Sequence, residues 1–229
     1  MKIVALVPAF NEALRLAKTI RGISEIKAVD KIVVINDGST DQTSQVVRKC
    51  QQEYPVELVE LTKNMGKGQA LNIGWQEYPA EIYLLIDADL EESAALASAL
   101  LEPVINQEVD MTIANFVTRQ VKTGKMGFGL AKSIASWGIK RLTGVATTSP
   151  LSGQRAVRQQ VLKECGGFAA GFGVEVELTI KALRLGYQIR EIDLPMTHRP
   201  TGRNLSGFMH RGKQLWMIIK VLVKAWRNK

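Results

Sequence analysis

Two carboxylates separated by one small residue follow a short apolar run in this chain. The run 82–86 is rich in β-branched and aromatic residues, which is typical of a buried strand, and Asp87 and Asp89 come directly after it. In an open α/β sheet, ligands bind beyond the carboxyl ends of the strands. Because Mg²⁺ is commonly held by one or two carboxylates plus substrate phosphates, this pair predicts a divalent-metal site. The alternative is an Asp that only caps the helix expected near Glu91.

Polar residues also follow the other predicted strands. Asn11 and Glu12 stand where the first strand turns into a helix, and their alternative role is to stabilise that helix N-terminus. Asp37 ends the second strand, where its carboxylate could accept hydrogen bonds from a nucleobase or ribose. Turn chemistry alone explains residues 38–41. Lys67 lies between two glycines in a loop that could approach a pyrophosphate, although the motif is not a P-loop.

The elements that must position these residues alternate between strands and helices. We expect strands at 3–7, 32–36, 56–61, 82–86, 110–114 and 187–194, and helices at 13–23, 42–54, 68–76 and 92–106. This alternation is typical of a parallel sheet covered on both faces, so the expected fold class is α/β. No Gly-x-Gly-x-x-Gly follows the first strand, which argues against NAD or FAD.

Charge is divided unevenly along the 229 residues, which carry a net charge of +8. Residues 1–118 contain 10 Lys and Arg against 17 Asp and Glu, whereas residues 119–229 contain 20 against 5. The basic second half favours an anionic partner such as a phosphate or acidic lipid. Nucleic acid is a weaker candidate and is not expected as a partner, because the chain contains no recognisable nucleic-acid-binding motif.

The cysteine count and the N-terminus indicate a cytoplasmic protein. Cys50 and Cys165 form neither a disulfide framework nor a metal motif, so a reducing compartment is expected. The first residues are apolar for only five positions before Pro8, which predicts a strand rather than a signal peptide. No uncharged apolar run is long enough to span a bilayer.

Four short motifs occur in the order and spacing of family 2 glycosyltransferases. They are Val7-Pro-Ala-Phe-Asn-Glu12, Asn36-Asp-Gly-Ser-Thr-Asp-Gln-Thr43, Asn64-Met-Gly-Lys-Gly68 and Asp87-Ala-Asp89. The chain therefore resembles this family over roughly residues 1–200. It is most similar to the polyprenyl-phosphate sugar synthase branch, which includes the dolichyl-phosphate mannose synthases. The resemblance implies a GT-A fold, a Rossmann-like, mostly parallel twisted sheet with helices on both faces.

The resemblance also implies roles for the matching positions. The residues expected to line the nucleotide pocket are Pro8, Ala9, Asn11 and Glu12, with Asp37 near the base and Lys67 beside the nucleotide. Asp87 and Asp89 would lie at the pyrophosphate and its Mg²⁺ or Mn²⁺, with Glu91 as a third metal ligand. One departure is Asn36, where the family more often has Asp.

Two further motifs, Ser152-Gly-Gln-Arg-Ala156 and Gly173-Val-Glu-Val-Glu-Leu178, support the same branch. Arg155 would face the donor phosphate or the acceptor. Glu175 and Glu177 are both catalytic candidates, but residues two apart lie about 200° apart around a helix, so they cannot share a face. We prefer Glu175, which would act as a general base for a hydroxyl acceptor or orient sugar hydroxyls for a phosphate acceptor.

His198 is one of two histidines and follows the strand expected at 187–194. A lone His is more often structural, but related GT-A enzymes place a metal-ligating His in this region. Arg199 and Arg203 would pair with the pyrophosphate or an acceptor phosphate.

Two amphipathic basic segments, 125–143 and 212–226, mix Lys and Arg with large apolar residues. The second could pack on the core or a second copy in a homodimer, or lie peripherally on the inner face of a membrane. We expect a GT-A domain over 1–205, with a nucleotide-sugar-binding half at 1–118 and an acceptor-side half at 119–205. Residues 206–229 would form a basic C-terminal helix.

The sequence thus predicts a metal-dependent inverting glycosyltransferase that uses a nucleotide-diphosphate sugar, with UDP-sugar favoured. The expected acceptor is polyprenyl phosphate at the membrane surface. One alternative is a retaining transferase that acts on a small soluble acceptor such as 3-phosphoglycerate. Another is a non-catalytic protein that only binds the nucleotide-sugar.

Overall fold

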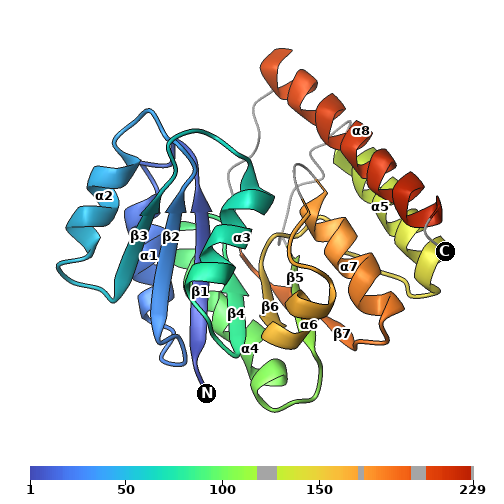
Figure 1. The fold of residues 1–229 in the computed structure, drawn as a ribbon, viewed down its shortest axis with the longest axis horizontal. Coiled ribbons are helices and arrows are strands. Elements are labelled where there is room, and N and C mark those ends of the chain that lie inside the picture. Colours follow the sequence, from blue (N-terminus) through green and yellow to red (C-terminus); the bar gives the residue numbers. More distant parts are fainter. Residues whose placement is uncertain (118–127, 170–172, 197–204, 228–229) are drawn as a thin grey trace.

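A seven-stranded sheet runs through the computed structural model, which describes residues 1–117, 128–169, 173–196 and 205–227 (Figure 1). The strand order is β3-β2-β1-β4-β6-β5-β7. Only β6 is antiparallel to its neighbours, so the mostly parallel α/β fold is confirmed. The strands are β1 (Ile3–Ala9), β2 (Lys31–Asn36), β3 (Val56–Glu60), β4 (Ile82–Leu85), β5 (Met111–Phe116), β6 (Arg155–Arg158) and β7 (Ile189–Leu194).

Helices cover both faces of the sheet, as the alternation along β1 shows. Ala5 and Val7 join the core under α1, α2 and α4, whereas Val4 and Leu6 join the core under α3, α6 and α7. The helices are α1 (Leu16–Ser24), α2 (Thr43–Cys50), α3 (Lys67–Glu77), the 3₁₀ helix η1 (Glu91–Ala97), α4 (Ser98–Ile105), α5 (Phe128–Thr143), α6 (Gln159–Glu164), α7 (Val174–Arg184) and α8 (Leu205–Arg227).

The chain reverses its direction of travel across the sheet at β1. Strand β1 pairs in parallel with β2 on one side and with β4 on the other. Loops that leave such neighbouring strands in opposite directions open a crevice beyond their carboxyl ends, which is where α/β proteins bind ligands. The fold therefore brings the polar residues after β1, β2 and β4 to one edge.

Several elements differ from the sequence expectation, among them α6, which no pattern predicted. Strand β1 runs on to Ala9, because Pro8 and Ala9 still pair with Ile35 and Asn36 of β2. The helix expected at 92–106 is instead η1 followed by α4, and η1 packs closely on α1 at Gly22, where an added Cβ would lie 3.1 Å from the Glu91 carbonyl oxygen.

Strand β6 was missed, because its four residues Arg-Ala-Val-Arg form no apolar run of strand length. Its Ala156 and Val157 are nevertheless fully buried between β4 and β5. Among the described residues, no helix combines the length and apolar character needed to cross a bilayer.

Candidate active site

The carboxylate of Asp87 lies at the centre of a polar cluster just beyond β4. It accepts hydrogen bonds from Lys67 Nζ at 2.6 Å and from Gln154 Nε2 at 2.7 Å. Lys67 Nζ also lies 2.9 Å from Glu175 Oε1. Side chains from α3, from the loop after β4, from the segment before β6 and from the first turn of α7 therefore meet at one point.

Lys67 is the cation that pairs with two carboxylates in this cluster. The side chains of Lys67, Asp87 and Glu175 are 31%, 35% and 17% exposed, so the cluster is partly open to solvent. Burial alone would lower the pKa of the Lys67 ammonium, but the Asp87 and Glu175 carboxylates outweigh burial and raise that pKa above its usual value. Lys67 therefore stays cationic throughout the neutral pH range and can face an anionic ligand.

Two glycines explain where Lys67 stands, at the first residue of α3. Gly66 precedes the helix with a φ of 90°, which glycine adopts at little cost. A Cβ on Gly68 would lie 1.8 Å from the carbonyl oxygen of Ala169, so only glycine fits there. The Gly-Lys-Gly motif is thus accounted for by protein contacts, and its approach to a pyrophosphate stays a prediction.

Asp37 anchors the loop that leads into α3. Its two carboxylate oxygens accept hydrogen bonds from the backbone N–H groups of Met65 at 2.7 Å and Gly66 at 2.8 Å. The side chain is buried. These bonds give Asp37 a positioning role for the Lys67 loop, and its predicted place near a nucleobase stays a prediction.

The turn after β1 is shaped by the motif after β2. Asn11 has a φ of 57°, and its Oδ1 accepts from the backbone N–H of Thr40 at 2.9 Å. The Glu12 N–H donates to Thr43 Oγ1 at 3.0 Å. Pro8 is half-buried and Ala9 is buried at the end of β1. The four residues predicted to line the nucleotide pocket therefore lie together at the β1–β2 edge of the sheet.

Asn36, where the family more often has Asp, holds the loop that follows β2. Its amide donates to Ser44 Oγ at 2.6 Å, and its Oδ1 accepts from the backbone N–H of Ser39 at 3.0 Å. An Asp could accept from Ser39 but has no N–H to donate to Ser44. Asn36 is also buried, so it acts on the loop through protein contacts.

The predicted metal ligands divide into two groups. Asp87 and Asp89 are half-buried carboxylates at the end of β4. Glu91 instead turns onto α1 with a φ of 51°, where its carboxylate lies 2.9 Å from Lys18 Nζ and 3.6 Å from Arg15 Nε. Its charge is matched by Lys18 of α1 and by Arg15, the residue before that helix, and its role as a third metal ligand stays a prediction.

No group of three His, Cys, Asp or Glu side chains in the described part of the chain is placed to hold a metal. Two carboxylates with hard oxygen donors suit Mg²⁺ or Mn²⁺ when a diphosphate supplies the remaining ligands. The donor set of Asp87 and Asp89 therefore fits a metal that arrives with its nucleotide. His198, Arg199 and Arg203 lie outside the described residues.

Arg155 is almost fully buried beneath the site. Its guanidinium donates to the carbonyl oxygen of Ser152 at 2.9 Å and to Thr179 Oγ1 at 2.8 Å. Burial lowers the pKa of Arg155 to about 10, so it remains cationic at neutral pH. Arg155 ties the loop before β6 to α7, and its contact with the donor phosphate or the acceptor stays a prediction.

The two glutamates of α7 point in different directions, as the helical period requires. Glu175 meets Lys67 in the Asp87 cluster, whereas Glu177 pairs with Lys181 Nζ at 3.1 Å and Lys224 Nζ at 3.5 Å. Glu177 therefore faces α8, and a catalytic role for it stays a prediction. The catalytic role of Glu175 stays a prediction.

Two neighbouring residues of the cluster were missed at the sequence level. Gln154 donates to Asp87, and a Cβ on Gly153 would lie 2.5 Å from Lys67 Nζ and 2.7 Å from Asp87 Oδ2. Both residues belong to the Ser-Gly-Gln-Arg motif, in which Arg155 is the only charged residue. In an extended chain, neighbouring side chains point to opposite sides, so Gln154 reaches the site and Arg155 does not.

Comparisons with known proteins agree with the motifs. A family model, Glycosyl transferase family 2, matches residues 4–172. A dolichol-phosphate mannosyltransferase of Pyrococcus furiosus is 26% identical over 236 residues, which cover 99% of this chain and 64% of that protein. An undecaprenyl-phosphate mannosyltransferase of Micrococcus luteus is 26% identical over 216 residues, which cover 89% of this chain and 87% of that protein.

Among solved structures, glucosyl-3-phosphoglycerate synthase from Mycobacterium tuberculosis is similar over most of the chain. Its complex with phosphoglyceric acid has a TM-score of 0.80 and 26% sequence identity, covering 98% of this chain and 79% of that one. Other structures of the same synthase contain UDP with Mn²⁺ or with Mg²⁺. This chain thus shares its fold with a GT-A glycosyltransferase, while it spans only 64% of the length of the Pyrococcus protein.

Proposed function

The chain belongs to glycosyl transferase family 2, and on that premise we propose that it moves a hexose from a nucleotide-diphosphate sugar to a phosphorylated acceptor. A UDP-sugar is the favoured donor, because the similar synthase structures contain UDP. The observation that carries the proposal is the cluster in which Asp87 meets Lys67 and Lys67 meets Glu175. It puts a cation and two carboxylates at the sheet edge where α/β proteins bind ligands.

The nucleotide would lie across the ends of β1 and β2. Pro8, Ala9, Asn11 and Glu12 would form its wall, and Asp37 would keep the Lys67 loop in place. Lys67 would face the diphosphate with a charge that does not depend on pH near neutrality. Because all these backbone turns are fixed by hydrogen bonds before ligand arrives, the site would be preorganised.

Asp87 and Asp89 would hold a Mg²⁺ or Mn²⁺ ion together with the donor diphosphate. When bound, the ion supplies positive charge that stabilises the departing nucleoside diphosphate. Gln154 and Lys67 orient Asp87 for this role, since both donate to its carboxylate. Ligation by His198 and phosphate contacts by Arg199 and Arg203 are part of the same proposal.

The acceptor is proposed to be polyprenyl phosphate, and the outcome inversion at the sugar C1. A phosphate oxygen is already ionised, so it can attack C1 from the face opposite the leaving group without a general base. The environment of Glu175 favours such an acceptor, because its Oε1 is already engaged by the Lys67 ammonium. Glu175 would then orient sugar hydroxyls rather than remove a proton.

A second candidate is a retaining transferase that acts on a small phosphorylated acceptor. It is favoured by the similarity to the synthase that was solved with phosphoglyceric acid. The two candidates share the donor site and differ in acceptor and in the anomer of the product. Product analysis by NMR with each acceptor therefore separates them.

The donor site is tested by thermal shift with UDP, GDP, dTDP and CDP, each with and without Mn²⁺. A nucleotide at 100 times its dissociation constant adds about 2.7 kcal/mol to folding stability, which corresponds to a rise of about 5 to 10 °C in Tm for a chain of this size. We expect one nucleotide to give a metal-dependent rise that Asp89→Ala abolishes. No rise with any nucleotide would refute the transferase proposal.

A further inference from the structure

Helices α5, α7 and α8 form a separate layer on one side of the molecule, on the side of the sheet away from α2 (Figure 1). They share a small apolar core of their own, to which each helix contributes two or more buried side chains: Ala131, Ala135, Ile139, Val176, Ile180, Ile218 and Leu222. Helix α7 lies between this core and the sheet, so α5 and α8 each keep an outward face.

The outward face of α8 is apolar, which packing on the core does not explain. Trp216, Ile219, Val223 and Trp226 are 56%, 43%, 46% and 52% exposed. Their spacing of three, four and three residues places them in one strip along the helix. Buried Ile218 and Leu222 belong to a different strip, so α8 carries apolar side chains both toward the core and toward solvent.

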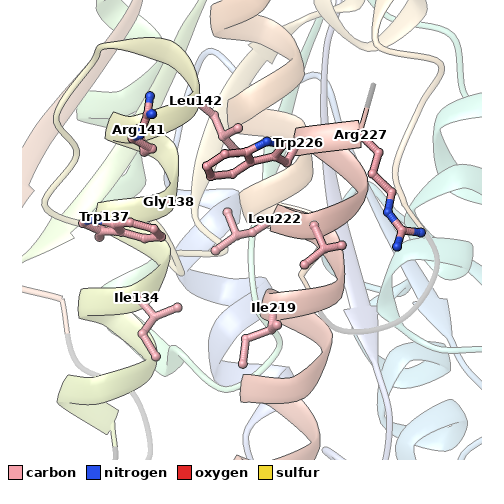
Figure 2. Close-up of a pocket in the computed structure, with 10 residues that line it drawn as sticks. Ile134, Trp137, Gly138, Arg141, Leu142, Ile219, Leu222, Trp226 and Arg227 are labelled. Atoms are coloured by element: carbon pink, nitrogen blue, oxygen red, sulfur yellow. The ribbon is translucent and has the colours of Figure 1, made fainter. Parts of the chain in front are cut away.

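A groove of about 320 Å³ runs between α5 and α8 (Figure 2). Apolar side chains from both helices line it, including Ile134, Trp137, Ile219, Leu222 and Trp226. Trp137 of α5 is 62% exposed at its edge. A long apolar chain would find contacts on both walls of this groove.

Cations flank the apolar strip, and acids are missing from both helices. The sequences of α5 and α8 contain eight Lys and Arg and no Asp or Glu. On α8, Lys220 and Arg227 lie in a second strip beside the tryptophans, together with Lys224, which also pairs with Glu177 of α7 at 3.5 Å. Lys220 Nζ lies 3.5 Å from the centroid of the Trp216 ring, and the Arg141 guanidinium lies 5.4 Å from that of Trp226.

Charge decides which occupant suits this face. A second copy related by a two-fold axis would bring the same patch against itself, so cations would meet cations. An anionic lipid surface instead meets the cations with phosphate, the tryptophans with headgroups and the aliphatic side chains with acyl chains. We propose that the α5–α8 face docks on the anionic surface of a membrane, with the groove between the helices receiving a lipid chain.

The α5–α8 face adjoins the helix that contributes Glu175 to the candidate active site. A Cβ on Gly173, the residue before α7, would lie 3.2 Å from Val221 Cγ2 of α8. Glu175 follows two residues later and reaches Lys67. Helix α8 therefore crosses the start of the helix that carries Glu175. The docking surface is argued from α5 and α8 alone, and only its link to a lipid-linked acceptor rests on the proposed function.

Vesicle flotation without donor or metal tests the docking surface by itself. We expect the protein to float with phosphatidylcholine vesicles that contain 30% phosphatidylglycerol, and to release as salt increases, because exposed charges are screened. Lys220→Gln should weaken partitioning about five-fold, the value of one cation near an anionic leaflet. The matched control is Lys49→Gln on α2, which removes an exposed cation from the opposite side and should change nothing.

Tryptophan quenching by brominated lipid locates the contact. Trp137, Trp216 and Trp226 should be quenched. Trp75, a half-buried residue of α3 that packs against the core between α3 and the sheet, should not. A variant with all three exposed tryptophans replaced by Ser should lose vesicle binding while it keeps its Tm and its nucleotide-dependent rise in Tm.

Absence of flotation at low salt would overturn the docking proposal, as would quenching of Trp75 alone. A concentration-dependent dimer that the triple Ser variant abolishes, without vesicle binding by the parent protein, would assign the face to a second copy. If the protein binds vesicles but shows no nucleotide-dependent rise in Tm, the proposed function is overturned and the docking proposal is not.

Discussion

The Asp87 cluster and the α5–α8 face are built by opposite means. The cluster combines side chains from four separate segments. Asp87 accepts hydrogen bonds from Lys67 at 2.6 Å and from Gln154 at 2.7 Å. The α5–α8 face is made of two helices whose apolar and basic strips repeat along each helix. One region depends on a few mutually held groups, and the other on many similar side chains.

The difference teaches how each region should respond to substitution. Groups that share hydrogen bonds in a partly buried site are coupled, so loss of one misplaces the others. Side chains that lie separately on a surface act almost additively, so each contributes a small part of the binding. Substitutions in the cluster should therefore act on rate by orders of magnitude, and those on the helical face by small factors.

The largest expected effect comes from Asp87→Asn. The amide keeps the size of the side chain but loses the charge that pairs with Lys67 and that would hold the metal. Loss of several kcal/mol of charge stabilisation corresponds to a fall of about a thousand-fold in kcat/KM for sugar transfer.

Asp30→Asn is the matched control for this rate measurement. Asp30 accepts from the Ile3 N–H at 2.7 Å at the opposite edge of the sheet, and an Asn can still accept there. Its rate should stay within a factor of about two. Equal losses in both variants would mean that Asp87 supports only the fold.

An intermediate effect is expected from Gly153→Ala. The new Cβ would lie within 3 Å of Lys67 Nζ and of both Asp87 oxygens, so the ion pair must shift. A displacement of that kind can reduce kcat by about 100-fold while the chain stays folded.

Gly212→Ala in α8 is the comparison, because an added Cβ there meets nothing within 4 Å. It should leave kcat unchanged and stabilise the helix by about 0.5–1 kcal/mol, measured by denaturant unfolding. An unchanged rate in Gly153→Ala would show that the Lys67–Asp87 contact is not needed for turnover.

The smallest effect is expected from Glu177→Gln on α7. Its partners Lys181 and Lys224 are 40% and 67% exposed, and pairs of this kind contribute at most about 1 kcal/mol to stability. The rate should stay within about two-fold. Glu175→Gln should lower it about ten-fold or more, because the amide can still accept from Lys67 but carries no charge to pair with it. A larger rate loss for Glu177→Gln would support its predicted catalytic role.

Much of the fold was accessible from local patterns. The alternation of strands and helices predicted the parallel part of the sheet, and the shared fold with a GT-A enzyme confirms the class. Strand β6 was not predicted, because it is short and has a charged residue at each end. Its pairing with β4 and β5 makes it a strand. The 3₁₀ helix η1, which the sequence pattern did not separate from α4, packs on α1, a neighbour distant in the sequence.

The sequence by itself determined which residues share a local face. The period of a helix separates Glu175 from Glu177 and aligns Trp216 with Ile219 and Val223, and strand ends carry Asp37 and Asp87, because these relations depend only on backbone geometry. Which face meets the site was decided by the tertiary structure. Lys67 and Glu175 are 108 residues apart, Glu91 turns to α1 and Arg155 turns inward. Contacts of that range exist only after the sheet and its helices have packed, so no local period can specify them.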